Sequence, residues 1–330
     1  FYKALRIDKR EHLAWAGYGM VYFYENRLAD SLDKLGQAVF LKASEPDYLF
    51  ANAQVSARAE RYRTAADNYA AFLRHSHIED ADRRARIKGL IAFLRVLGQV
   101  DGLHVSSGKQ QTSVPFELIG DRPVINVKIN GSDEPLRFVL DTGSGISVLS
   151  EETAKRIGIK PVTRGGYARG IGGDGKFEIV YSLLREITIG DVTVKTVPVF
   201  LRKLHSESEH FDGYIGLSLI SKFLTTIDYG DSTFSLTKRD HGLLDPNENA
   251  SLSLPLRLTS SGFLSGEVML EGVESPLNFI VDTGASVSVI SDRVAREDEA
   301  RGWANAGRLR VIGSAGVKDG VPTYMLPSVK

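Results

Sequence analysis

The sequence predicts a multidomain α + β chain in which N-terminal antiparallel helical repeats precede two mainly-β lobes. Three observations lead to this fold class. Apolar residues recur at helical spacing up to about residue 98, and strand-like text takes over after residue 113. A stretch of some forty residues then occurs twice, and both copies contain the triplet Asp-Thr-Gly. A repeat that keeps its register over this length indicates a duplicated domain.

The expected boundaries follow from shifts in composition along the chain. The segments are a helical repeat domain at 1–98, a linker at 99–113, a first lobe at 114–239, a connector at 240–250 and a second lobe at 251–330. The linker is polar and rich in Gly and Ser, which is typical of a connecting segment.

The helical segment repeats at an offset of 34 residues, where Arg27 aligns with Arg61 and Asp33 with Asp67. Its pattern of large and small residues resembles the tetratricopeptide repeat, in the positions Trp15, Gly19, Tyr22, Ser31, Leu35 and Ala38. A further helix is expected at 79–97, with its charged run at 80–88 forming a solvated face. The groove of such repeats either binds a protein partner or is simply core, and the sequence leaves both open.

Composition narrows the range of functions. The 41 basic and 41 acidic residues cancel, so no overall field favours nucleic acid or an anionic membrane. No stretch approaches the roughly 20 apolar residues of a membrane span. The chain has no cysteine, which excludes disulfides, thiol nucleophiles and thiolate metal sites.

The repeated phrase is the most informative part of the chain. A lone Asp-Thr-Gly after a strand is usually a plain turn. Here the match extends from Pro135 and Pro276 to Gly172 and Gly313 at one constant offset. A chain that builds the same acidic turn twice can bring two carboxylates together, and paired carboxylates carry out general acid–base hydrolysis.

These residues resemble the aspartic peptidases of the pepsin and retropepsin superfamily. Asp141-Thr142-Gly143-Ser144 is similar to their active-site turn, and a copy length of about 125 residues is closer to a compact retropepsin-type lobe. Gly170-Ile171-Gly172-Gly173 resembles a flap tip, and Asp212-Gly213-Tyr214-Ile215-Gly216 resembles the hydrophobic-Gly segment that passes behind the turn. The best overall match is to bacterial proteins with tandem retropepsin-like domains behind helical repeats.

The resemblance implies an aspartic endopeptidase that cleaves extended polypeptides with a water held between Asp141 and Asp282. Two carboxylates about 3 Å apart cannot both ionise, so such a pair shares one proton. Ser144 would donate a hydrogen bond to Asp141, which Ala285 cannot do for Asp282. The expected supporting residues are Thr142, Gly143, Ser144, Thr283, Gly284 and Ala285; the flap residues are Ile171, Gly172, Gly173, Ile312 and Gly313; and the hydrophobic-Gly segment is Tyr214, Ile215 and Gly216.

No cofactor or metal is expected, and relatives of this kind suggest a periplasmic or otherwise extracytoplasmic location. Gly170, Gly172 and Gly175 also fit a dinucleotide fingerprint, but the residues after them read as a strand where a helix is required. His75 with His77, and His205 with His210, lack a third ligand at useful spacing.

The second copy is expected to be incomplete, because its hydrophobic-Gly segment would fall at about 353 to 357, beyond Lys330. Two alternatives therefore stand beside an intramolecular Asp141–Asp282 pair. One is a catalytically inactive peptidase fold that acts as a binding or regulatory module on a helical adaptor. The other is activity only as a dimer of first lobes.

Overall fold

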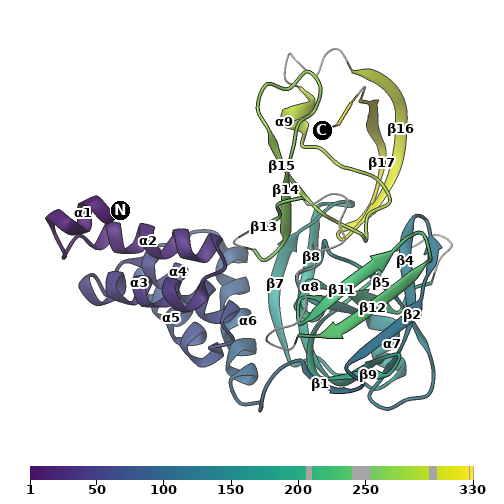
Figure 1. Cartoon of the computed structure of the whole chain (residues 1–330), viewed down its shortest axis with the longest axis horizontal. Coiled ribbons are helices and arrows are strands. Elements are labelled where there is room, and N and C mark those ends of the chain that lie inside the picture. Colours follow the sequence, from purple (N-terminus) through teal and green to yellow (C-terminus); the bar gives the residue numbers. More distant parts are fainter. Residues whose placement is uncertain (206–209, 240–253, 260, 297–302, 327, 330) are drawn as a thin grey trace.

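The computed structural model describes residues 1–205, 210–239, 254–259, 261–296, 303–326 and 328–329. A layer of helices lies beside a large β lobe, and a smaller β lobe stands on top of the large one (Figure 1). A helical region followed by mainly-β domains is therefore confirmed. The predicted connector at 240–250 lies outside the described residues.

Two helical hairpins repeat with a spacing of 34 residues. The helices are α1 (Tyr2–Ile7), α2 (His12–Tyr24), α3 (Leu28–Leu41), α4 (Pro46–Arg58), α5 (Tyr62–His75) and α6 (Ala81–Leu97). Helices α2 and α4 begin and end 34 residues apart, and so do α3 and α5. The turns match as well, because Asn26 and Glu60 both have positive φ, 57° and 60°. The particular type of helical repeat stays a prediction.

The first lobe contains two sheets around one apolar core. Its strands are β1 (Val105–Gly108), β2 (Gln111–Pro115), β3 (Glu117–Ile119), β4 (Arg122–Ile129), β5 (Leu136–Leu140), β6 (Ser147–Ser150), β7 (Thr163–Arg169), β8 (Lys176–Ile189), β9 (Val192–Arg202), β10 (Gly213–Ile215), β11 (Phe223–Asp228) and β12 (Thr233–Lys238). Two short helices, α7 (Glu151–Arg156) and α8 (Leu217–Ile220), follow β6 and β10.

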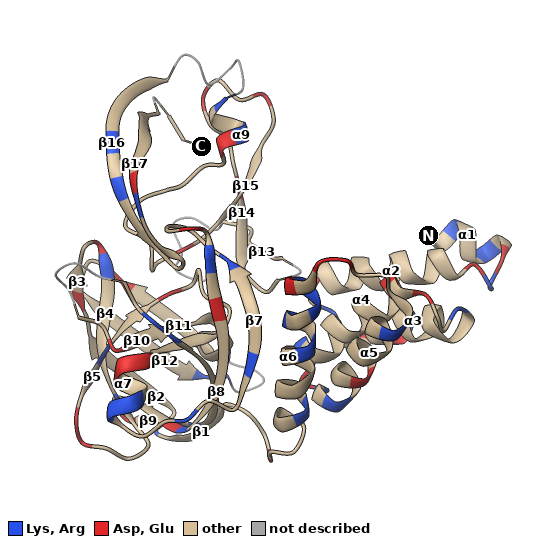
Figure 2. Ribbon diagram, turned by 180° about the vertical axis from the view of Figure 1, so that it is seen from behind, with Lys and Arg blue, Asp and Glu red and all other residues tan. Residues whose placement is uncertain are grey.

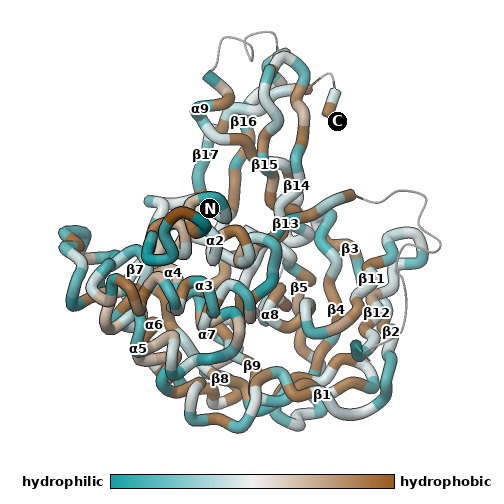
Figure 3. Tube along the Cα trace, turned by 60° about the vertical axis from the view of Figure 1, so that its left-hand side comes forward, coloured by the Kyte–Doolittle hydropathy of each residue, from teal (hydrophilic) through white to brown (hydrophobic). Residues whose placement is uncertain are grey.

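The larger sheet runs in the order β1-β9-β6-β10-β5-β4-β8-β7, with β3 added to β4. Strands β8 and β9 also pair with each other, so the sheet closes on itself. The smaller sheet has the order β11-β12-β2. Apolar residues are concentrated along the strands of this lobe (Figure 3), and Phe138, Leu140 and Phe234 are completely buried.

The structure differs from the expectation of a linker at 99–113. Strand β1 pairs with β9, and β2 pairs with β12, so residues from 105 onward belong to the first lobe. The polar text has a physical reason. These strands are at sheet edges, where Ser and Gln side chains face solvent and only alternate residues such as Thr112 turn inward.

The second lobe is smaller and more open. Its elements are β13 (Arg257–Leu258), β14 (Leu264–Val268), β15 (Leu277–Ile280), α9 (Asp292–Ala295), β16 (Ala304–Gly313) and β17 (Gly316–Met325). They form a β13-β14-β15 sheet and a β16-β17 hairpin that reaches down to the first lobe (Figure 1). Leu270, Val273 and Trp303 are the buried residues of its core.

Helix α6 packs directly on the β7-β8 hairpin. Gly89 lies so close to this hairpin that a Cβ would come within 2.3 Å of the Gly165 Cα. The charged run of α6, expected to be a solvated face, is partly an interface. Arg86 donates a hydrogen bond to the Tyr167 carbonyl at 2.6 Å, and Lys176 pairs with Asp82 at 3.0 Å.

Positive and negative residues are interspersed over the helices and the β structure (Figure 2), in keeping with the balanced composition. Within the residues that the structure describes, no helix combines the length and the apolar character that crossing a membrane requires.

Candidate active site

The first Asp-Thr-Gly turn is fixed by the strands around it. Asp141 directly follows β5, whose residues Val139 and Leu140 are completely buried. The Asp141 N–H donates to the Ile215 carbonyl at 3.0 Å. The turn is therefore held from behind by the segment that the sequence singled out at Tyr214, Ile215 and Gly216.

Strand β10 contributes this support by inserting between β5 and β6. It pairs in parallel with β5 and antiparallel with β6. Glycine is required at its end, because a Cβ on Gly216 would come within 2.8 Å of the Ser144 carbonyl oxygen. The Gly216 N–H donates instead to the Ser147 hydroxyl at 3.0 Å.

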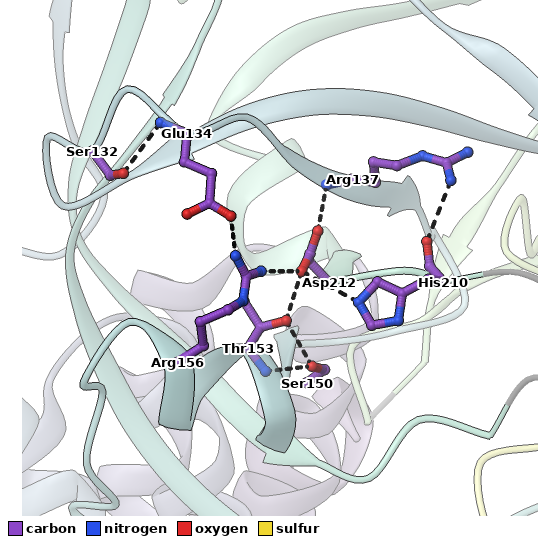
Figure 4. A network of polar contacts seen from close by, with 8 residues as sticks. All are labelled: Ser132, Glu134, Arg137, Ser150, Thr153, Arg156, His210 and Asp212. Carbon is purple, nitrogen blue, oxygen red and sulfur yellow. Dashed lines mark hydrogen bonds and ion pairs between the residues drawn. The ribbon is translucent and has the colours of Figure 1, made fainter.

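A buried carboxylate anchors the start of β10. Asp212 is 5% exposed. Its Oδ1 accepts hydrogen bonds from the Thr153 hydroxyl at 2.6 Å and from Arg156 at 3.0 Å, and its Oδ2 accepts from the Arg137 N–H at 2.9 Å (Figure 4). The motif contained Asp212, but nothing in the local sequence indicated this network, because its partners come from other strands and from α7.

The two turns are locked together by reciprocal hydrogen bonds between their threonines. The Thr142 hydroxyl donates to the Val281 carbonyl at 2.7 Å and accepts from the Thr283 N–H at 3.0 Å. The Thr283 hydroxyl donates to the Leu140 carbonyl at 2.7 Å and accepts from the Thr142 N–H at 3.2 Å. Each lobe therefore completes the backbone hydrogen bonding of the other.

This grip brings the two carboxyl groups face to face. A Cβ on Gly143 would lie 2.2 Å from the Asp282 carboxyl carbon, and one on Gly284 would lie 2.6 Å from that of Asp141. Both glycines are thus needed for the close approach. The carboxyl groups hydrogen-bond to each other, and the Gly284 N–H donates to Asp282 Oδ1 at 2.8 Å.

The environments of the two acids are unequal. Asp141 is half-buried, whereas Asp282 is exposed. Burial, together with the charge of Asp282, raises the pKa of Asp141 from its ordinary 3.8 to about 7. One proton is therefore retained on the pair near neutral pH, and Asp141 is the member that environment favours for it.

Ser144 does not play the role that the resemblance implied. Its hydroxyl donates to the Ile146 carbonyl at 2.7 Å, so its single hydrogen is not available for Asp141. The reason is local: the turn bends back on itself, which places the Ile146 carbonyl within reach. Ala285 contributes only its backbone, as expected.

The two predicted flaps meet above the carboxyl pair. Residues 170–175 join β7 to β8, and residues 314–315 join β16 to β17. The Ala315 N–H donates to the Ile171 carbonyl at 2.7 Å, and the Gly173 N–H donates to the Val317 carbonyl at 3.0 Å. Gly172 has a φ of 89° and would collide with the Gly316 carbonyl if it carried a Cβ.

Arg202, at the end of β9, ties these tips to the first lobe. Its guanidinium lies 3.8 Å from the ring centre of Phe177 and donates to the Ser314 carbonyl. Burial lowers its pKa. Sequence reasoning did not single out Arg202, because its partners come from two hairpins that are distant in sequence.

A cavity of about 800 Å³ opens beside Asp282 on the side of the second lobe. It is lined by side chains of β15, by residues 285–291 and by the flap residue Ile171. Across the described part of the chain, no group of three or more His, Asp or Glu side chains is arranged to hold a metal ion.

Comparison with known proteins agrees with this geometry. Residues 125–219 and 266–330 each match the family described as aspartyl protease, and each match contains one Asp-Thr-Gly turn. The chain therefore carries two segments of the aspartyl protease type in tandem. A solved structure similar to this chain is a retropepsin-like aspartic protease from Rickettsia conorii. It is 18% identical, covers 42% of this chain and 97% of its own, and has a TM-score of 0.29. No curated protein sequence matches the chain.

Proposed function

We propose that the chain is an aspartic endopeptidase whose two lobes each supply one catalytic acid. The observation that carries this proposal is the pairing of Asp141 with Asp282 through the reciprocal Thr142–Thr283 grip. A scaffold without chemistry has no need of two acids held in contact, because desolvating and crowding them costs free energy.

In the proposed reaction, a water bound between the carboxyl groups attacks the carbonyl carbon of a peptide bond. The ionised Asp282 takes a proton from this water while the protonated Asp141 donates to the carbonyl oxygen, which gives a gem-diol. Collapse of the gem-diol breaks the C–N bond, and the proton held by Asp282 passes to the leaving amine. The pair then shares one proton again.

The flaps supply the substrate side of the proposal. The tips at Ile171–Gly173 and Ile312–Gly313 are joined by backbone hydrogen bonds above the acids. An extended polypeptide between tips and acids would be shielded from bulk water, which strengthens electrostatic interactions at the cleft.

Among the alternatives, a dimer of first lobes is disfavoured by one contact. Thr142 is already engaged by Thr283 of the same chain. A first-lobe dimer would have to break this grip and rebuild it with a second Thr142. The inactive binding module is the remaining alternative, and the exposure of Asp282 is the observation in its favour.

The test is cleavage of an unfolded protein between about pH 3 and pH 8 by the wild type, Asp141→Asn and Asp282→Asn, with exposed Asp231→Asn as the matched control. General acid–base groups contribute about 10²- to 10⁴-fold to rates, so each active-site variant should lose at least that lower factor. Activity per mole should not change on dilution if the pair forms within one chain. Cleavage that survives in both variants would sink the proposal.

A polypeptide partner on the helical repeats and an extracytoplasmic location are also proposals, which pull-down and fractionation of cells that produce the chain would test.

A further inference from the structure

The duplication allows the second lobe to be compared with the first, position by position. In the first lobe, β10 lies between β5 and β6 and covers their apolar residues. Val139, Leu140 and Val148 are 0%, 0% and 3% exposed. Their counterparts at the constant offset, Ile280, Val281 and Val289, are 42%, 41% and 53% exposed. Side chains that are core in one lobe are therefore open in the other.

The backbone shows the same difference. Strand β15, the counterpart of β5, pairs with β14 on one edge only. In the first lobe the Asp141 N–H donates to the Ile215 carbonyl, and the Ser147 hydroxyl accepts from the Gly216 N–H. No corresponding bond is found for the Asp282 N–H or for Ser288 within the described ranges of the chain. One strand edge and one turn thus lack the neighbour that their counterparts have.

The open position is a cavity rather than a flat surface. The cavity of about 800 Å³ is bounded on one side by Leu277, Phe279 and Ile280, and on the other by Val287 and Val289. We call this cavity, between β15 and residues 287–290, the second-lobe slot. Asp282 is the one charged residue among those that line it, so an occupant should be apolar and uncharged.

We propose that the second-lobe slot binds a partner polypeptide as an added β-strand, parallel to β15, with the pattern apolar-apolar-Gly. An exposed apolar strand edge is a ready template for such pairing. Strand β10 defines the pattern, since Tyr214, Ile215 and Gly216 fill the equivalent position in the first lobe. Glycine is specified because the equivalent Cβ on Gly216 would come within 2.8 Å of the Ser144 carbonyl. This interaction does not depend on the proposed peptidase activity.

The probe is a ten-residue peptide with the sequence of residues 210–219, titrated into the whole chain. Trp303 packs in the same cluster as Leu277, Phe279 and Ile290, so its fluorescence reports on the slot. Trp15→Phe removes the other tryptophan. We expect a saturable change in fluorescence and slower hydrogen exchange at 277–281 and 287–291. A peptide with valine in place of the glycine that corresponds to Gly216 should bind at least ten-fold more weakly.

Two variants of the chain test the location. Val289→Asp places a charge in the slot at a solvent-exposed position, so the fold should persist, and it should weaken binding at least ten-fold. Leu309→Asp is the matched control, because Leu309 is 45% exposed on β16 and does not line the slot. It should leave binding unchanged.

A weak free peptide is covered by a tethered form. The same ten residues fused after Lys330 through a flexible Gly/Ser linker of about 20 residues reach about 25 Å, at millimolar effective concentration. If neither the free nor the tethered peptide protects 277–291, or if the valine peptide binds equally well, the proposal is overturned. If sedimentation shows a dimer that Val289→Asp dissociates, a second copy occupies the slot and the partner proposed here is wrong.

Discussion

Phe93 of helix α6 stacks on Tyr181 of strand β8, with ring centres 4.4 Å apart and ring planes 23° from parallel. Both rings are buried. Strand β8 also forms one side of the first flap hairpin, so the helical repeats are packed against the base of an element that covers the carboxyl pair. The helices therefore have a direct mechanical route to the cleft.

This route can be tested at Gly89. A Cβ there would lie 2.3 Å from the Gly165 Cα, so Gly89→Ala should push α6 away from β7 and cost about 1–3 kcal/mol of unfolding free energy. Hydrogen exchange at residues 163–189 should become faster. Gly36→Ala is the control, since nothing lies within 4 Å of the added Cβ in another helix. If the two variants exchange alike, α6 does not brace the flap.

The threonine grip should be essential to assembly of the site. Thr142→Ala removes a donor to Val281 and an acceptor for Thr283, each worth about 1 kcal/mol, so we expect a loss of about 2 kcal/mol in urea unfolding together with a large loss of activity. Thr142→Ser keeps the hydroxyl and should retain most of both. A Thr142→Ala protein as stable and active as wild type would contradict the role of the grip.

Stability should depend on pH through Asp141. Because burial beside Asp282 raises its pKa to about 7, the folded protein holds a proton that the unfolded chain releases between about pH 4 and pH 7. The contribution of Asp141 to the free energy of unfolding is therefore fully present below pH 4 and decreases as pH rises to 7. Subtracting the pH profile of Asp141→Asn from that of the wild type isolates this contribution. A flat difference would show that the proton is not held there.

Arg202 should control how tightly the flaps close. Arg202→Gln loses the contact with the Phe177 ring and the bond to the Ser314 carbonyl, while it leaves the carboxyl pair untouched. We expect KM for a polypeptide substrate to rise about ten-fold with kcat changed much less, since about 1.4 kcal/mol of binding corresponds to that factor. A loss confined to kcat would place Arg202 in the chemical step instead.

Asp212 should matter for the integrity of the site, although it lies on the far side of the turn. Asp212→Asn removes the charge opposite Arg156 and replaces one acceptor oxygen by a donor at a buried position. Breaking a buried pair of this kind costs about 3–5 kcal/mol, which urea unfolding would detect. Asp231→Asn, at an exposed turn, should cost almost nothing.

The turns and flaps were predictable because their geometry depends on local residue types. Glycine at 143 and 284 is required for close approach, and a hydroxyl at 142 and 283 is required for the grip. The duplication made these requirements visible twice. The 34-residue spacing of the helices was visible for the same reason.

Other features depend on contacts between distant segments and left no local signal. The residues of β1 and β2 read as a linker because edge strands tolerate polar side chains. The packing of Gly89 on Gly165 brings two glycines together that have no common pattern in sequence. Ser144 was assigned to Asp141 by resemblance, but the path of the turn gives it the nearer Ile146 carbonyl.

Two turns at separate positions of one chain also have a consequence for how a substrate would be read. A cleft made of two identical halves cannot distinguish the N-to-C direction of a bound peptide from its reverse. Here Ser144 faces Ala285, and the helical repeats pack on the first hairpin through α6. Each half can change without altering the other, so the cleft has a built-in polarity and the bound peptide is expected in one orientation.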